Sequence, residues 1–139
     1  MSTNIRPELS QKNKYYVEKH RYYELKHFCL QYPVWKKAYY ALDGLAKRPY
    51  DLMLFSQSNS NSSPTERCAL SREYFYSRMR LVEEACNATD SIIGQYILHA
   101  VTEGCSYEVL RTRYGIPCCK DIYYELYRKF FWILNKSRD

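Results

Sequence analysis

Residues 106–134 constrain the fold of this chain more than any other stretch. They read SYEVLRTRYGIPCCKDIYYELYRKFFWIL, in which a Gly-Ile-Pro turn separates two helical patterns. Ser106 can cap a first helix over residues 107–114, and Gly115 can end that helix with a left-handed backbone. Pro117 keeps the residue before it extended, so a second helix can begin shortly afterwards. A short helix, a tight turn and a longer helix in this order are typical of a helix-turn-helix.

The second helix of this motif has two distinct faces. Its buried stripe is predicted from apolar side chains at helical spacing, namely Ile122, Leu126, Phe130 and Ile133. Lys120, Tyr124 and Arg128 fall on a face away from that stripe. A recognition helix presents such residues to base edges and phosphates, and Arg111 and Arg113 on the first helix are placed to contact the DNA backbone. The alternative is a helical hairpin with a solvated face.

The rest of the chain is also predicted to be helical. Helical periodicity covers residues 12–32, 34–45, 63–86 and 90–104, each bounded by proline, glycine or a capping side chain. In the first of these helices, one face is predicted to contain Tyr15, Tyr22, Leu25, Phe28, Cys29 and Tyr32. Ile116 is expected to fill the angle between the last two helices, with Cys118 or Cys119 as the cap of the final one. These patterns indicate an all-α bundle of five to six helices with a C-terminal helix-turn-helix.

The organisation of the chain follows from one low-complexity segment. Residues 56–63 (SQSNSNSS) are predicted to be a flexible polar loop between the basic, Tyr-rich helices of residues 1–55 and the helical segment of residues 64–139. Neither part alone is large enough to bury a comfortable core, so one compact domain is expected overall. Residues 1–11 are expected to form a loose polar arm.

Charge and tyrosine content bear on the kind of partner. The net charge is +6, and the two ends of the chain are basic while residues 51–104 are acidic. A basic balance favours a polyanionic partner. The chain has 16 tyrosines, a residue type suited both to the rim of a core and to contact surfaces. Both readings of the tyrosines stay open at this stage.

Several classes of protein are not expected. No signal peptide and no stretch of about 18 apolar residues is present, which favours a cytoplasmic protein that does not span a membrane. The six cysteines are then expected as reduced thiols, and no Cys-x-x-Cys pair indicates a metal site. No glycine-rich phosphate loop occurs, and the three histidines belong to no recognisable catalytic constellation. We therefore expect no enzyme, cofactor or metal.

The stretch GCSYEVLRTRYGIPCCKDIYYELYRKFFWIL, with the helix from Ser91 before it, resembles the helix-turn-helix of sigma-factor region 4. It is also similar to the domain of small late-gene regulators of phages in Gram-positive bacteria, the ArpU and RinA type, and the whole chain resembles small prophage proteins of gut Firmicutes. Two positions depart from the pattern. Arg111 stands where a small residue is usual, and Asp121 stands where a buried aliphatic is usual, with Ile122 one residue later. A turn longer by one residue is therefore expected.

The resemblance implies a phage-encoded protein that binds double-stranded DNA in the major groove, most simply a transcription regulator, and symmetric operators would imply a homodimer. One alternative is a protein-binding module, such as a phage inhibitor of a host protein, that uses its Tyr-rich helical surface. A second alternative is a DNA binder like a terminase small subunit.

Overall fold

The computed structural model describes residues 13–42 and 64–138, and within these ranges all regular structure is helical. The predicted all-α class is therefore confirmed. The expected N-terminal arm, the Ser/Asn loop of residues 56–63 and the cap at Ser63 lie outside the described residues. Two compact units can be distinguished, the first within Met1–Gln31 and Leu81–Asp139, the second within Tyr32–Arg80.

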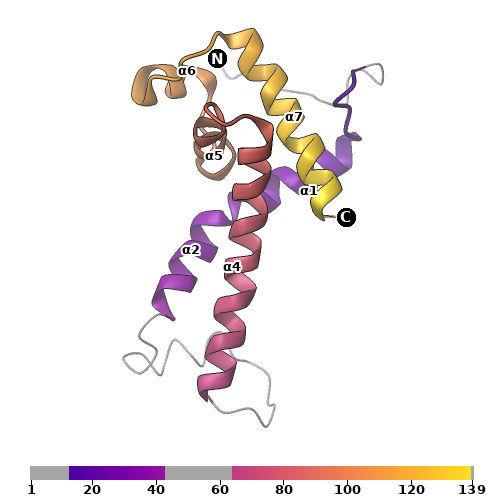
Figure 1. The fold of residues 1–139 in the computed structure, drawn as a ribbon. Helices are drawn as coiled ribbons and strands as arrows, with labels where there is room; N and C mark the ends of the chain where they lie inside the picture. Colours follow the sequence, from indigo (N-terminus) through magenta and orange to yellow (C-terminus); the bar gives the residue numbers. More distant parts are fainter. Residues whose placement is uncertain (1–12, 43–63, 139) are drawn as a thin grey trace. The chain divides into compact units, whose positions relative to one another are not determined.

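The first unit contains most of the helices (Figure 1). They are α1 (Lys19–Leu30), the end of α4 (Pro64–Thr89), α5 (Gly94–Glu103), α6 (Tyr107–Val109) continuing into the π-helical turn η3 (Leu110–Tyr114), and α7 (Lys120–Arg138). Helix α1 packs against both α5 and α7, and α5 also packs against η3. Helix α1 is thus the element on which the C-terminal helices are assembled.

Helix α1 buries the face that its periodicity predicts but begins later than predicted. Its buried residues are Tyr22, Leu25, Phe28 and Cys29. The helix starts at Lys19, not near residue 12, because the Glu18 side chain accepts hydrogen bonds from the backbone amides of His20 and Arg21 and thereby caps it. Upstream, the Asn13 side chain accepts from the Tyr15 amide and forms a turn instead.

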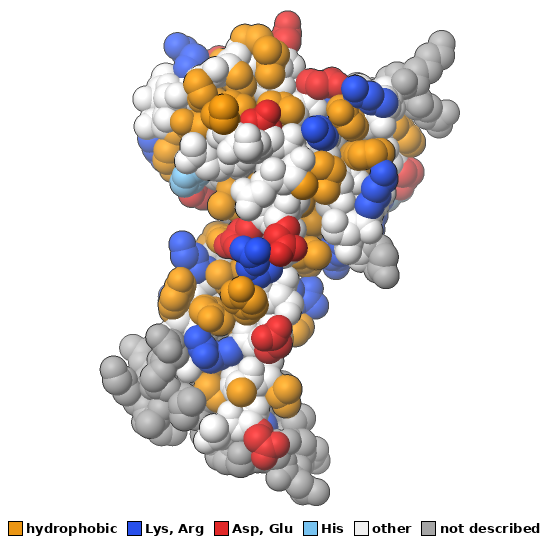
Figure 2. Space-filling view, viewed as in Figure 1, with side chains coloured by type: hydrophobic (Ala, Val, Ile, Leu, Met, Phe, Trp, Pro, Cys, Tyr) orange, Lys and Arg blue, Asp and Glu red, His pale blue; other side chains and the backbone are white. Residues whose placement is uncertain are grey.

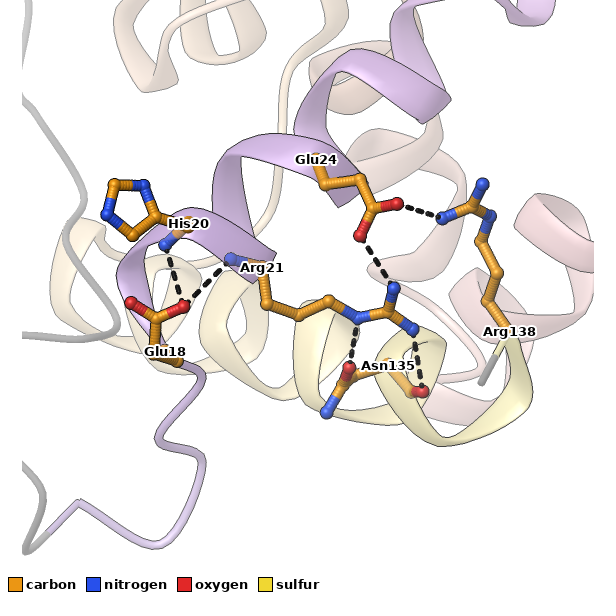
Figure 3. Close-up of polar contacts among 6 residues, drawn as sticks. All are labelled: Glu18, His20, Arg21, Glu24, Asn135 and Arg138. Atoms are coloured by element: carbon orange, nitrogen blue, oxygen red, sulfur yellow. Dashed lines mark hydrogen bonds and ion pairs between the residues drawn. The ribbon is translucent and has the colours of Figure 1, made fainter.

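A polar cluster joins α1 to the C-terminal end of α7 (Figure 3). The Nε of Arg21 donates to the Asn135 side-chain oxygen at 2.6 Å, and its Nη1 lies 2.7 Å from a carboxylate oxygen of Glu24. The other oxygen of Glu24 lies 3.4 Å from Arg138, whose guanidinium also stacks over the Phe28 ring. These contacts hold the last turns of α7 against α1.

The second unit consists, in its described part, of α2 (Tyr32–Ala41) and residues 64–80 of α4. Pro33 occupies the first turn of α2, as predicted. The buried residues here are Tyr32, Trp35, Ala38, Leu42, Cys68 and Met79. The Cys68 thiol donates to the Leu42 carbonyl oxygen at 3.5 Å, and the rings of Tyr39 and Tyr76 lie 5.9 Å apart. Of the two large apolar residues after Pro33, Trp35 is therefore buried and Val34 is exposed.

Neither a membrane-spanning helix nor a metal-binding cluster occurs in the described ranges. None of the helices there combines the length and apolar character that crossing a bilayer requires. Within the same ranges, no three His, Cys, Asp or Glu side chains are grouped so that they could hold a metal ion.

Candidate nucleic-acid interface

The chain reaches residues 106–134 through a capped turn and a close contact between two helices. Asp90 follows α4, and its carboxylate accepts from the amides of Ile92 and Ile93, both at 2.8 Å, which lowers the pKa of Asp90. The next helix, α5, begins at Gly94, where a Cβ would lie 2.5 Å from the Cys86 carbonyl oxygen. Only glycine therefore allows α5 to start this close to the backbone of α4.

The first helix of the motif has the predicted bounds and an unusually wide last turn. The Ser106 hydroxyl accepts from the Val109 amide at 3.3 Å, so the predicted cap is formed. The amides of Gly115 and Ile116 both donate to the Leu110 carbonyl oxygen, which gives η3 its π-helical geometry. Gly115 has φ 67° and ends the helix in the left-handed conformation, as predicted. Gly104 ends α5 in the same way, with φ 74°.

The turn between η3 and α7 is held from both sides. Ile116 is buried, as predicted for the residue that fills the angle between the helices. The Tyr107 hydroxyl donates to the Cys118 carbonyl oxygen at 2.7 Å, and the Tyr107 ring packs on Tyr123 with centroids 5.6 Å apart. The Cys119 carbonyl accepts the first helical bond of α7 from Tyr123, so Cys119 takes the cap position. From this turn, α7 runs along α1 instead of folding back beside α6 (Figure 1).

The predicted buried stripe of α7 is wrong in register. The buried residues are Tyr123, Tyr127, Phe130, Phe131 and Leu134, so only Phe130 is common to both sets. Ile122 is 53% exposed, and Leu126 and Ile133 are half-buried. The reason is that tyrosine provides the core contacts: the Tyr127 hydroxyl pairs with that of Tyr22 at 3.1 Å inside the unit. Treating tyrosines as apolar at helical spacing would have located this stripe from the sequence.

This register places the three predicted α7 contact residues along one side of the helix. Lys120 is exposed in the first turn, with its Nζ 5.7 Å from the centre of the Tyr124 ring. Tyr124 is half-buried beside Tyr123. The Arg128 side chain is 29% exposed and lies 3.9 Å from Glu125. Lys120 is thus the most accessible of the three.

The two arginines of the first helix lie on the other side of the turn. Arg111 and Arg113 are both exposed. A 3.1 Å ion pair joins Arg111 to Glu108 within the same helix. The hydrogen bond to Glu103 raises the pKa of Tyr114, the residue after Arg113, and the Arg113 guanidinium opposes that rise. The predicted cations therefore form two groups: Arg111 and Arg113 before the turn, and Lys120 and Arg128 after it.

A polar cluster that the sequence analysis missed attaches η3 to α5. The His99 ring stacks on Tyr114 with centroids 4.1 Å apart, and His99 Nδ1 lies 2.7 Å from Glu103 Oε2. The Tyr114 hydroxyl donates to Glu103 Oε1 at 3.0 Å. These hydrogen bonds, led by the one with His99, lower the pKa of Glu103. Residues four apart on a helix can form a side-chain pair, so the sequence could have predicted the contact between His99 and Glu103. No feature of the nearby sequence predicts that Tyr114 joins them.

Another missed feature lies near the C-terminal end of α7, where lysines and aromatic rings alternate. The rings of Tyr15 and Trp132 meet edge to face at 5.4 Å. The Nζ of Lys136 lies 3.3 Å from the centre of the Trp132 ring, and the Nζ of Lys14 lies 5.0 Å from that of Tyr15. Both lysines are exposed, so this cluster adds positive charge to the first unit beyond the motif itself.

Comparison with known proteins adds no relative: no protein-family model matches the chain, and searches of curated proteins and of solved structures find no significant match.

Proposed function

We propose that this protein binds double-stranded DNA through residues 106–128. The observation that carries the proposal is the turn centred on Gly115. The turn lies between η3 and α7, and the buried side chain of Ile116 fills the angle between them. The hydrogen bond from the Tyr107 hydroxyl to the Cys118 carbonyl oxygen holds the turn closed. Exposed cations lie on both sides of this turn, and helix-turn-helix proteins use that arrangement to place the second helix in the major groove.

The proposed roles follow from the chemistry of each side chain. Arg111, Arg113 and Lys120 contact phosphate oxygens, which position the protein without reading sequence. Asp121 is exposed at the start of α7, where a carboxylate can accept a hydrogen bond from the amino group of cytosine. Tyr124 and Arg128, being half-buried, act at the edge of the contact. Recognition in this scheme combines few phosphate contacts with a small number of base contacts.

The biological role we propose is transcription regulation by occupancy of an operator, as in the phage regulators that the motif resembles. A packaging role like that of a terminase small subunit would use the same DNA contacts. The preferred DNA sequence distinguishes the regulator from the packaging protein. A regulator prefers a short operator sequence, and selection from a pool of random duplexes would enrich that sequence. Neither role requires a chemical step, and both are consistent with a cytoplasmic protein.

The experiment that tests DNA binding is a salt titration of duplex affinity. The logarithm of the binding constant is expected to fall linearly with the logarithm of salt concentration, with a slope that changes by about one for each phosphate contact removed. Arg111→Ala, Arg113→Ala and Lys120→Ala should each reduce the slope by roughly that amount. Lys37→Ala is the matched control, because Lys37 is equally exposed but belongs to the second unit. Binding that is weak and unchanged in the three variants would contradict the proposal.

A second candidate function is binding to another protein, and the second unit provides the observation that favours it. The exposed large apolar residues there are Val34, Tyr40, Leu70, Tyr74 and Tyr76. Figure 2 shows hydrophobic side chains exposed among charged ones over α2 and the first half of α4. This surface is separate from the residues proposed to contact DNA, so the two functions do not compete for side chains.

A further inference from the structure

The outward face of α4 carries a short seam in which two side chains are apolar and exposed. Leu70 is 65% exposed and Tyr74 is 52% exposed, whereas Cys68 and Met79 on the same helix are buried. At 100° per residue, Leu70, Tyr74 and Ser77 point to the side opposite Cys68 and Met79. Their separations of four and three residues are the spacing by which one helix packs against another in a coiled coil.

Two opposite charges flank this seam. Glu73 directly precedes Tyr74, and Arg78 directly follows Ser77, so they lie on opposite edges of the seam. Both are held next to it: the Ser77 hydroxyl donates to Glu73 Oε2 at 3.0 Å, and the Arg78 guanidinium lies 4.3 Å from the centre of the Tyr74 ring. The acidic edge and the basic edge are therefore defined by the structure of α4 itself.

The positions of Glu73 and Arg78 are complementary to those in a second copy of α4 that lies parallel to the first. In a parallel pair of identical helices, an edge residue of one helix faces the opposite-edge residue five positions later in the other. Glu73 and Arg78 have that separation, so a second copy of the chain would place Glu73 against Arg78 twice, once on each side of the seam. In an antiparallel pair each edge meets itself, and like charges would face one another.

The core within the described part of the second unit, residues 32–42 and 64–80, supports the same conclusion. Its described part is two helices with few buried side chains, and two helices of this size bury little apolar surface between them. A further helix against Leu70 and Tyr74 would add apolar burial at about 25 cal/mol per Å². We propose that α4 pairs in parallel with α4 of a second copy, with Leu70, Tyr74 and Ser77 forming the seam and Glu73 pairing with Arg78 of that copy.

This pairing goes beyond DNA binding and can be tested without DNA. Sedimentation equilibrium of the full chain is expected to show a concentration-dependent dimer of twice the 16.7 kDa of one chain. Glu73→Arg and Arg78→Glu should each weaken dimerisation, by roughly tenfold, because each places like charges across the seam. The double variant Glu73→Arg/Arg78→Glu restores both ion pairs and should recover most of the affinity. Leu70→Glu should abolish the dimer.

The control is Tyr40→Glu, since Tyr40 is an exposed aromatic residue on α2 and lies outside the seam. It should leave the dimer unchanged, and circular dichroism should show full helical content in every variant. A wild-type chain that stays monomeric up to about 0.5 mM would overturn the proposal. An assembly larger than a dimer, or a dimer that persists in the Leu70→Glu variant, would also overturn it. The same holds if the double charge variant dimerises no more tightly than the single variants. The dimerisation experiments contain no DNA, so a failure of the proposed DNA binding would not change their outcome.

Discussion

Buried tyrosines join the helices of the first unit through their rings and their hydroxyls. Tyr22, Tyr123 and Tyr127 are almost fully buried, and burial is the main cause that raises the pKa of Tyr123 and of Tyr127. Tyr123 and Tyr127 are therefore neutral at physiological pH. The Tyr22 and Tyr127 hydroxyls satisfy each other at 3.1 Å, and the Tyr22 ring packs against Phe131 with centroids 5.0 Å apart. A paired hydroxyl inside a core avoids the cost of an unsatisfied one.

This pairing predicts strong coupling between two substitutions. Tyr22→Phe and Tyr127→Phe should each lower the free energy of unfolding by about 1 kcal/mol, because each leaves one buried hydroxyl without its partner. The double variant should cost clearly less than the sum, since neither hydroxyl remains. Urea unfolding monitored by circular dichroism measures all four proteins. Additive costs would show that the two hydroxyls do not depend on each other. Tyr124→Phe is the control and should change stability by less than about 0.5 kcal/mol.

How far the sequence predicts individual residues depends on the kind of signal. Gly104, Ser106 and Gly115 were predictable because each satisfies a local backbone requirement at a helix end. The buried face of α7 was not, because tyrosine fits both a core and a surface, and only the packing of α1 decides which side is covered. That is why Ile122 is exposed while Tyr123 next to it is buried.

At the scale of elements, glycine sets how closely α5 approaches the end of α4. Gly94 has no room for a side chain, since a Cβ would lie 2.5 Å from the Cys86 carbonyl oxygen and 3.0 Å from its carbon. These are backbone atoms, so they cannot move aside as a flexible side chain could. The position of α5, and with it that of η3 packed on α5, therefore depends on this one residue.

Substitution of this glycine should be costly even though alanine is the better helix former. Gly94→Ala is expected to destabilise the protein by about 2 kcal/mol or more, since the backbones must separate. Gly104→Ala is a useful comparison, because its nearest non-neighbouring atom is 4.0 Å away and only its left-handed φ is strained. It should cost about 1 kcal/mol. Thermal unfolding of both variants tests whether Gly94→Ala is the more destabilising of the two substitutions. A Gly94→Ala protein as stable as the wild type would refute the close contact.

Element types and most boundaries followed from periodicity and caps, but the contacts between elements did not. The Arg21–Asn135 bond joins residues 114 positions apart, and the stacking of Tyr114 on His99 crosses two helices. Such pairs leave no periodic signal in a single sequence. The start of α1 also differed from the periodicity, because the Glu18 cap decides where helical hydrogen bonding begins.

At the scale of the whole molecule, the two proposed contact surfaces belong to different units. The first unit has the exposed cations around the Gly115 turn and the lysine–aromatic cluster at Trp132. The second unit has the exposed apolar residues of α2 and α4. We propose that the first surface contacts DNA and that the second mediates self-association. A twofold dimer would present two copies of the helix that we propose to bind DNA, as symmetric operators require.

The most direct test of DNA binding through residues 106–128 is a backbone-amide NMR titration of the full chain with duplex DNA at low salt. We expect the largest shift changes within η3, the turn after Gly115 and the first turns of α7, with smaller changes near Lys14 and Lys136. Raising the salt concentration should reverse them, because phosphate contacts dominate. The absence of any change, or changes concentrated in α2 and residues 64–80 of α4, would contradict the account.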